Sequence, residues 1–276
     1  MGEQAFGGTL RTAPVAASRR SLCAKSVYDW AVASDPGLGR GHNEDAWRIE
    51  PELGAFALAD GMGGYNAGEV ASAIAVDVAL AQPFDQPAGA SSPDPLEQLA
   101  RAVSAANASI LAAAARRPQC LGMGTTLALA WISGTRLFHA HVGDSRIYLL
   151  RGHELLRLTR DHTVGQAMID TGSIDPASSR VATFRGVLTR ALGVEPSVAP
   201  DLGELELRPG DRVLLCTDGL SDPLDDDAIR ALLGTGARAA AQAAALVQAA
   251  LAAGSLDNIT AVVAVAPGEP PANGPA

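Results

Sequence analysis

The sequence predicts an α+β protein built in layers, and two observations lead to that fold class. Short apolar or alternating segments of β character occur in groups, and three longer segments repeat small and aliphatic residues at three- and four-residue steps, as helices do. Strands in meanders with helices bunched between them favour layered sheets and helices over the strict strand–helix alternation of a nucleotide-binding sheet. The 276 residues suffice for one large domain.

The individual elements follow from these periodicities. A Pro-rich stretch at 83–95 predicts a surface loop, and Gly134-Thr135 between two apolar runs predicts a hairpin. The predicted helices have few polar positions, so we expect them to pack closely against a sheet. The predicted helices are 68–81, 95–117 and 238–253. The predicted strands are 27–33, 54–59, 125–132, 137–142, 146–150, 211–216 and 259–265.

Both ends of the chain lack periodicity and are rich in residues that break regular structure. We therefore expect a flexible lead over residues 1–25, an ordered domain over 26–266 and a disordered tail over 267–276. The lead carries Arg and Ser and almost no acid, which suits a transit segment superficially, but it lacks the apolar core of a secretory signal. A plain flexible lead is the simpler interpretation.

Composition and charge exclude several classes of function. The chain is 47% hydrophobic and 18% charged with a formal net charge of -9, which is typical of a globular protein and gives no general attraction to nucleic acid. Any phosphate that it handles must be held locally, by a metal or an arginine. No apolar run reaches the roughly 18 residues of a membrane span. Three cysteines without a CxxC pair predict neither disulfides nor a zinc site, and indicate a reducing compartment, the cytoplasm by default.

Five aspartates lie beside predicted strands: Asp45, Asp60, Asp144, Asp218 and Asp257. Two of them end an apolar run and precede glycine, so the backbone can turn there without a Cβ penalty. Converging carboxylates would repel one another unless divalent cations joined them, and oxygen donors without a Cys or His cluster select Mg²⁺ or Mn²⁺. One Asp-Gly pair would also suit an ordinary turn, but the repeated placement favours a metal site.

Eight segments, in order, resemble the motif series of the metal-dependent protein phosphatase family (PPM, type 2C), in its bacterial branch. The resemblance extends over residues 30–265. The segments are RGHNEDA (40–46), ADGMGGYNAGEVAS (59–72), GMGTTLA (122–128), HVGDSRIYLL (141–150), LTRDHT (158–163), LTRALG (188–193), LLCTDGLSD (214–222) and DNITAVV (257–263).

The resemblance implies a four-layer αββα sandwich, in which two central antiparallel sheets are flanked by helices, with a binuclear Mn²⁺ or Mg²⁺ centre at one end of the sheets. It makes 26–266 the catalytic domain. Carried over by position, Asp60 would bridge both metals, and the Gly61 carbonyl would bind one of them. Arg40 would hold the substrate phosphate, since its planar fork matches two phosphate oxygens. Asp218 and Asp257 would hold the other metal, Glu44 would bind through water, and Asp144 and Asp222 with Asp218 would form a third site.

The function implied is a protein serine/threonine phosphatase that reverses the action of a bacterial Ser/Thr kinase. We expect a monomer by default, since no sequence feature indicates an oligomer. Two alternatives stay open: a pseudophosphatase that binds a partner without turnover, and a phosphatase of small molecules. A cysteine-dependent phosphatase is excluded because Asp222 stands six residues after Cys216, where that chemistry needs arginine. No P-loop signature occurs either. For Arg40, the simple alternative is a surface arginine beside Glu44.

The chain departs from many eukaryotic relatives in one respect: Met62 stands where they carry a histidine proposed to protonate the leaving group. His42 and His162 are candidates for that role, or are ordinary surface or structural histidines. His139 and His141 share one face of a predicted strand, where they are either packed side chains or metal ligands. Residues 165–186 correspond to the family's variable flap, and are either a substrate-contacting loop or a simple tether.

Overall fold

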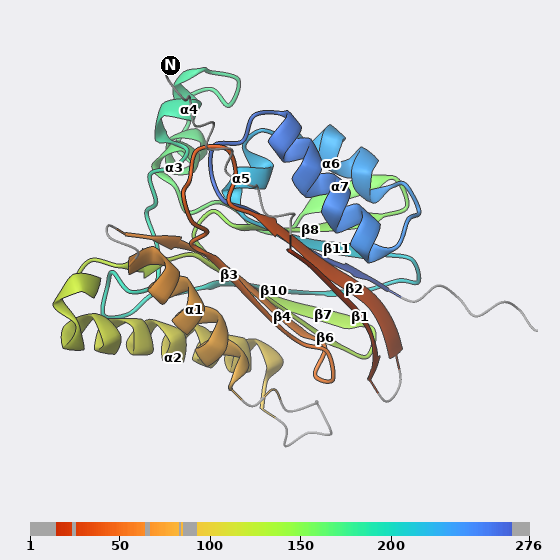
Figure 1. Ribbon diagram of the computed structural model, residues 1–276, viewed down its shortest axis with the longest axis horizontal. Helices are drawn as coiled ribbons and strands as arrows, with labels where there is room; N and C mark the ends of the chain where they lie inside the picture. Colours follow the sequence, from red (N-terminus) through yellow and green to blue (C-terminus); the bar gives the residue numbers. More distant parts are fainter. Residues whose placement is uncertain (1–14, 24–25, 64–66, 83, 85–92, 267–276) are drawn as a thin grey trace, which may run out of the picture.

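Two antiparallel sheets form the centre of the molecule in a computed structural model that describes residues 15–23, 26–63, 67–82, 84 and 93–266 (Figure 1). The first sheet has the order β1 (Val15–Cys23), β2 (Ser26–Asp35), β12 (Ile259–Val265), β11 (Arg212–Cys216), β8 (Arg146–Arg151) and β9 (Glu154–Arg157). The second has the order β10 (Asp201–Glu206), β7 (Arg136–Val142), β6 (Leu127–Ser133), β4 (Ala55–Met62) and β3 (Asp45–Glu50), and the short β5 (Gly124–Thr125) pairs with β4.

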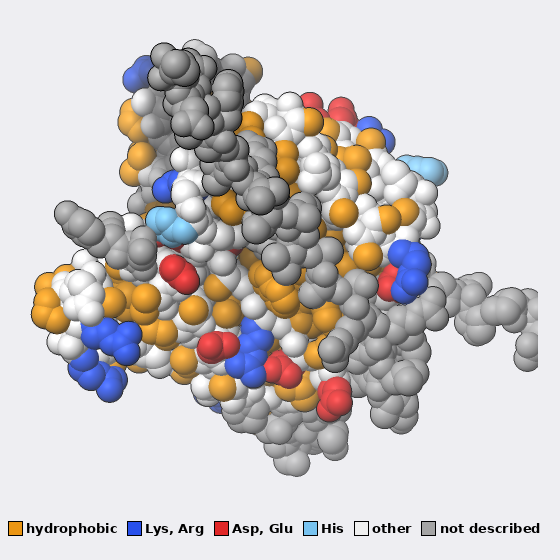
Figure 2. Space-filling model, viewed as in Figure 1, with side chains coloured by type: hydrophobic (Ala, Val, Ile, Leu, Met, Phe, Trp, Pro, Cys, Tyr) orange, Lys and Arg blue, Asp and Glu red, His pale blue; other side chains and the backbone are white. Residues whose placement is uncertain are grey.

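Helices cover the outer face of each sheet (Figure 1). The pair α1 (Ala67–Leu80) and α2 (Pro95–Arg116) packs on the second sheet, while α6 (Asp226–Leu233) and α7 (Ala239–Ala252) pack on the first. The face seen in Figure 2 carries scattered charged side chains among apolar and uncharged ones. This four-layer arrangement confirms the αββα sandwich expected from the sequence.

The strands are apolar along their length because both of their faces are covered. In β4, Ala55, Ala57 and Ala59 face α1 and α2, whereas Phe56 and Leu58 face the other sheet. The alternation is that of a strand with period two. Small alanines on the helix side let α1, itself rich in buried alanine, approach the sheet closely. The larger side chains fill the space between the sheets.

All three predicted helices exist, with ends shifted by one residue at most, and the seven predicted strands overlap β2, β4, β5 with β6, β7, β8, β11 and β12. The predicted hairpin is the turn at Gly134-Thr135 between β6 and β7. The sequence analysis did not identify β3, β9 and β10, which are partly exposed and mix polar with apolar residues. It also missed the short helices η1 (Pro118–Cys120), α3 (Val164–Asp170), α4 (Arg180–Phe184), α5 (Asp218–Ser221) and α6.

Residues 15–23, within the expected flexible lead, instead form β1. The backbone of β1 pairs with β2 over its whole length, so hydrogen bonds to a neighbouring strand define it rather than a periodicity of its own. Residues 1–14 and the expected tail 267–276 lie outside the described residues. Most of the predicted loop at 83–95 does too, but Phe84 is buried with its ring 5.3 Å from that of Trp131.

None of the helices in the described part of the chain combines the length and the apolar composition needed to cross a membrane.

Candidate metal centre

A cavity of about 310 Å³ brings together seven of the eight residues to which the family resemblance assigns a role in binding metal or phosphate. It lies where strand ends of both sheets meet, and Asp222 is the one selected residue that does not line it. The lining residues are Arg40, Glu44, Asp60, Gly61, Met62, Gly63, Thr126, Asp144, Gly186, Leu188, Asp218 and Asp257. Residues more than 200 positions apart in the chain therefore share one site.

Strand pairing delivers these side chains to the same edge. Asp60 lies near the end of β4, opposite Asp45 on β3. In the other sheet, β11 and β12 are antiparallel neighbours, so Asp218 just after β11 and Asp257 just before β12 reach the same end. Rigid strand ends are suitable positions for ligands because the hydrogen-bonded ladder holds the backbone.

Hydrogen bonds fix the backbone of Asp60 on both sides. Its N–H donates to the Thr126 hydroxyl at 2.8 Å, and its carbonyl accepts from the Thr125 hydroxyl at 2.7 Å and the Thr126 N–H at 2.9 Å. Both threonines are buried. Since the backbone polar groups are bonded within the protein, the Asp60 carboxylate is left to face the cavity.

Glycine is required at position 61 by close packing. A Cβ atom there would lie 2.2 Å from the carbonyl oxygen of Gly68, in the first turn of α1, and 2.7 Å from that of Glu44. A Cβ on Gly68 would in turn meet Glu44 Oε2 at 2.9 Å. The two glycines therefore let the start of α1 close onto the strand that carries Asp60, and keep Glu44 against it.

The carboxylates are buried together, and this raises their pKa values. Burial, followed by the charges of Asp45 and Asp218, raises the pKa of Asp60 well above its ordinary value. Burial and then Asp218 raise the pKa of Asp144 to about 8. Burial and then Asp222 and Asp257 raise the pKa of Asp218 to about 6. The protein thus brings acids together without supplying enough positive charge of its own.

A divalent cation fits this donor set. The buried Oδ1 atom of Asp218 has no hydrogen-bond partner, and an unsatisfied buried carboxylate oxygen is costly unless a cation takes it. The other lining donors are carboxylate and carbonyl oxygens, the hard ligands that Mg²⁺ and Mn²⁺ prefer.

Arg40 lies at the mouth of the cavity rather than free on the surface. Its Nη2 donates to Asp257 Oδ2 at 2.9 Å, and about half of the side chain is exposed. The hydrogen bond and charge of Asp257, and then Glu44 and Asp60, raise its pKa. A permanent cation with part of its fork facing solvent is suited to hold an incoming anion.

Asp222 stands one helical turn after Asp218, and its N–H donates to the Asp218 carbonyl at 2.7 Å. Its side chain does not line the cavity and meets Arg185 Nη1 at 3.3 Å, although its charge acts on Asp218. Among the selected acids, it is therefore a neighbour of the site rather than part of its wall.

Two residues that support the site were given no ligand role in the sequence analysis, although Asp45 was among its five strand-adjacent aspartates. The carboxylate of Asp45 accepts from the hydroxyls of Thr217 at 3.0 Å and Thr260 at 2.6 Å, and burial raises its pKa to about 7. Asn258 accepts the Glu44 N–H at 2.8 Å and donates to the His42 carbonyl at 3.0 Å. Asp45 shared the strand-adjacent position of the other acids, which was a usable signal, whereas Asn258 offered only its place beside Asp257.

The two candidate histidines occupy different environments. His42 is half exposed beside the cavity, with Nε2 3.1 Å from Glu44 Oε1. His162 is buried, accepts the Gly143 N–H at Nδ1, and lies with Nε2 3.2 Å from Asp201. Neither histidine lines the cavity, but His42 contacts Glu44, which does, whereas His162 contacts Asp201, which does not.

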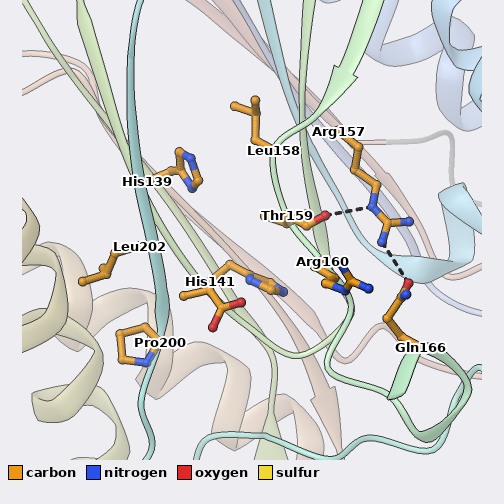
Figure 3. Close-up of a pocket in the computed structure, with 10 residues that line it drawn as sticks. His139, His141, Arg157, Leu158, Thr159, Arg160, Gln166, Pro200 and Leu202 are labelled. Carbon is orange, nitrogen blue, oxygen red and sulfur yellow. Dashed lines mark hydrogen bonds between the residues drawn. The ribbon is translucent and has the colours of Figure 1, made fainter. Parts of the chain in front are cut away.

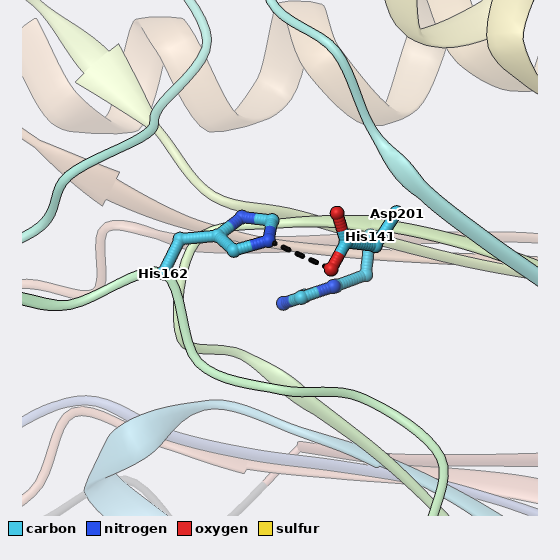
Figure 4. Close-up of side chains that lie close together, drawn as sticks. All are labelled: His141, His162 and Asp201. Carbon is cyan, nitrogen blue, oxygen red and sulfur yellow. Dashed lines mark ion pairs between the residues drawn. The ribbon is translucent and has the colours of Figure 1, made fainter. Parts of the chain in front are cut away.

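His139 and His141 line a larger cavity of about 730 Å³ that contains one carboxylate, that of Asp201 (Figure 3). His141, His162 and Asp201 present possible ligand atoms within 4.8 Å of one another (Figure 4). However, Arg190 Nη1 lies 3.1 Å from His162 Nε2 and 2.8 Å from Asp201 Oδ1. A guanidinium already supplies the positive charge there, which favours a packed, structural role for the cluster.

The expected flap, residues 165–186, contains nearly all of α3 and the whole of α4. Gly186 at its end and Leu188 just beyond it line the acidic cavity.

Comparison with known proteins agrees with this geometry. Residues 40–254 match the family model of protein phosphatase 2C. The serine/threonine protein phosphatase PstP of Mycobacterium tuberculosis is 43% identical over 238 residues, which cover 86% of this chain and 45% of that protein. The chain thus spans less than half the length of this relative. A serine/threonine phosphatase of Listeria monocytogenes is 32% identical over 234 residues, covering 83% of this chain and 92% of that protein.

Solved structures are similar as well. The crystal structure of M. tuberculosis PstP matches with a TM-score of 0.80 and 42% identity, covering 87% of this chain and 99% of that one. The PstP catalytic domain in complex with two manganese ions matches with a TM-score of 0.77 and 42% identity, covering 87% of this chain and 98% of that one.

Proposed function

Because this chain belongs to the protein phosphatase 2C family, we propose that it is a metal-dependent protein serine/threonine phosphatase. The observation that carries the proposal is the convergence of Asp60, Asp218 and Asp257 in one cavity with Arg40 at its mouth. Had these acids lain on separate faces, they could not share ions.

We assign the residues as follows. Asp60 and the Gly61 carbonyl, with Asp218 and Asp257, would hold two divalent cations, with Glu44 contributing through water. Asp144 would contribute to a third, weaker metal site together with Asp218. Asp222 would join that site only if its side chain left Arg185. When bound, the cations would supply a water of lowered pKa and neutralise phosphate charge.

The protein's own groups then position the substrate. Arg40 would bind phosphate oxygens with the part of its fork that Asp257 leaves free, and the β-strand ends keep the donors fixed while the reaction proceeds. Met62 in the cavity wall has no proton to give. His42, held against Glu44, would instead hold the proton for the departing Ser or Thr oxygen.

Several finer assignments belong to the same proposal. The catalytic domain would be residues 26–266, using Mn²⁺ or Mg²⁺ on phosphorylated Ser/Thr proteins and opposing a Ser/Thr kinase. The two manganese ions of the related PstP structure support the choice of metal. We further propose a monomer in the cytoplasm, where the buried free thiols of Cys120 and Cys216 would stay reduced.

The test is hydrolysis of p-nitrophenyl phosphate and of phosphothreonine peptides with and without Mn²⁺. We expect Mn²⁺-dependent turnover that Asp60→Asn abolishes and that alkylation of cysteines leaves unchanged. Asp227→Asn, an exposed acid on α6, is the matched control. Metal binding without turnover would instead indicate a binding module, and hydrolysis of sugar phosphates in preference to peptides would indicate a small-molecule phosphatase.

A further inference from the structure

A second groove, of about 540 Å³, opens directly beside the acidic cavity. The two share three lining residues, Met62, Gly186 and Leu188. The groove then continues along the segment from Leu188 to Ala199, past the side chains of Val187 and Val194. These valines are 48% and 55% exposed. Apolar surface that is continuous with a reactive cavity is suited to contact whatever enters that cavity.

Met62 forms the boundary between the two spaces. Its backbone pairs with Gly124, and a Cβ atom at Gly124 would lie 2.6 Å from Met62 Cε and 3.3 Å from Val194 Cγ2. The absence of a side chain at Gly124 therefore lets Met62 and Val194 lie over the same spot. Apolar side chains thus line the groove from the wall of the acidic cavity outward, among the polar residues Thr189, Arg190, Glu195 and Ser197.

The far wall of the groove is held from beneath by Asn107 of α2, which is 2% exposed. Its Oδ1 accepts the Gly193 N–H at 2.7 Å, and its Nδ2 donates to the Glu195 carbonyl at 3.0 Å. Leu192 also pairs with Thr125 of β5. Both sides of the bend that carries Val194 are therefore fixed, so the groove is formed before any ligand arrives, which reduces the entropic cost of binding.

We propose that this groove selects phosphopeptides that carry an aliphatic side chain close to the phosphorylated residue, an inference that rests on the proposed function. When the phosphate is in the acidic cavity, the flanking peptide must cross the adjoining surface, since each extended residue advances only about 3.3 Å. Glu195 and Arg190 both line the groove, but Arg190 is already bonded to Asp201 at 2.8 Å, so Glu195 would repel an acidic side chain at the same peptide position.

The experiment compares phosphothreonine peptides in which Leu, Ala or Asp is placed in turn at each position flanking the phosphothreonine. With the Mn²⁺-loaded enzyme, we expect one or two positions at which kcat/KM falls in the order Leu, Ala, Asp, with Leu over Ala on the order of tenfold, as for an apolar side chain in an apolar pocket. Val194→Asp should reduce that ratio towards one. Leu156→Asp, an equally drastic change at an exposed apolar residue of β9, should leave the ratio unchanged.

Equal kcat/KM for the Leu and Ala peptides at every position, or a preference that Val194→Asp does not change, would overturn the inference. Either of these results is also expected if another part of this chain, or a second copy of it, fills the groove. Hydrolysis of p-nitrophenyl phosphate and the Ala peptide in the same assay would show that the phosphatase survives while the groove inference fails. No turnover of any phosphoester with Mn²⁺ would overturn both.

Discussion

Two groups of buried acids in this molecule differ in the source of their positive charge. Asp161 accepts from Arg146 at 2.7 Å through Nη2 and at 3.0 Å through Nε, and Arg157 lies 3.5 Å away. In the acidic cavity, Asp60 and Asp218 are partly buried, and the arginine that lines the cavity, Arg40, is bonded to Asp257 instead. A buried acid with its own guanidinium completes the fold, whereas a group of acids without one calls for a cation from outside.

The largest contrast should appear when one acid of each group is neutralised. Asp161→Asn leaves Arg146 buried without its anion, which we expect to lower the free energy of unfolding by about 3–5 kcal/mol. Asp218→Asn, in the presence of a chelator, removes like-charge repulsion and should leave that free energy unchanged or higher. Urea unfolding of both variants measures the difference. Equal destabilisation would mean that the cavity acids have partners within the protein.

Metal binding should stabilise the protein only while the cavity acids are intact. Excess Mn²⁺ at about 100 times its dissociation constant would raise the free energy of unfolding by about 2.7 kcal/mol, because it binds the folded state. A thermal shift with and without chelator measures this, and calorimetry gives the affinity. Asp218→Asn should lose the effect and Asp227→Asn should keep it. A stabilisation that persists in Asp218→Asn would place the cation elsewhere.

The metal-free protein should become less stable as pH rises. The raised pKa values of Asp45, Asp144 and Asp218 mean that the folded state keeps protons that the unfolded chain has already released above its ordinary carboxyl pKa of about 4. Stability should therefore fall between about pH 4 and pH 8, by on the order of 2 kcal/mol. Thermal melts in chelator across that range test this, and Mn²⁺ should remove the slope. A flat profile in chelator would contradict the raised pKa values.

The smallest of these effects concerns the support of Asp45. Thr260→Val removes the 2.6 Å hydrogen bond to its carboxylate, which lies beside Asp60, and we expect Mn²⁺ affinity and kcat/KM each to fall about tenfold, as when a metal site loses a supporting hydrogen bond. The matched control is Thr235→Val, whose hydroxyl bonds the Leu232 carbonyl at an exposed position. If both variants behave like the wild type, Asp45 does not act on the metal centre.

Much of the fold was predictable because its signals are local. Strand β4 alternates between two covered faces, and α1 repeats alanine at helical spacing, so each could be recognised from a short window of sequence. By contrast, β1 and β10 were not predicted. These two edge strands are defined by backbone hydrogen bonds, of β1 with β2 and of β10 with β7. Because backbone pairing does not depend on residue type, it gives the sequence of an edge strand no periodic pattern.

The candidate site was predictable in its chemistry but not in its arrangement. Asp-Gly pairs at strand ends, together with motifs that resemble those of a known family, selected oxygen donors that line one cavity. The sequence analysis placed Asp222 with them, and the structure adds that Asp222 also meets Arg185, a partner that no local pattern indicates. It named both His42 and His162 as candidates for protonating the leaving group. His162, however, is buried against Asp201 and does not line the cavity. Side-chain direction depends on neighbours that are distant in the sequence.

The sequence by itself therefore determined the types of element, the apolar faces and the kind of metal ligand, since these depend on residue type and spacing. Only the tertiary structure decided that Arg40 meets Asp257 across 217 positions, that Asp45 faces Asp60, and that an apolar groove opens beside the acids. The physical reason is that antiparallel register and sheet packing bring remote strand ends together, and no local pattern encodes that meeting.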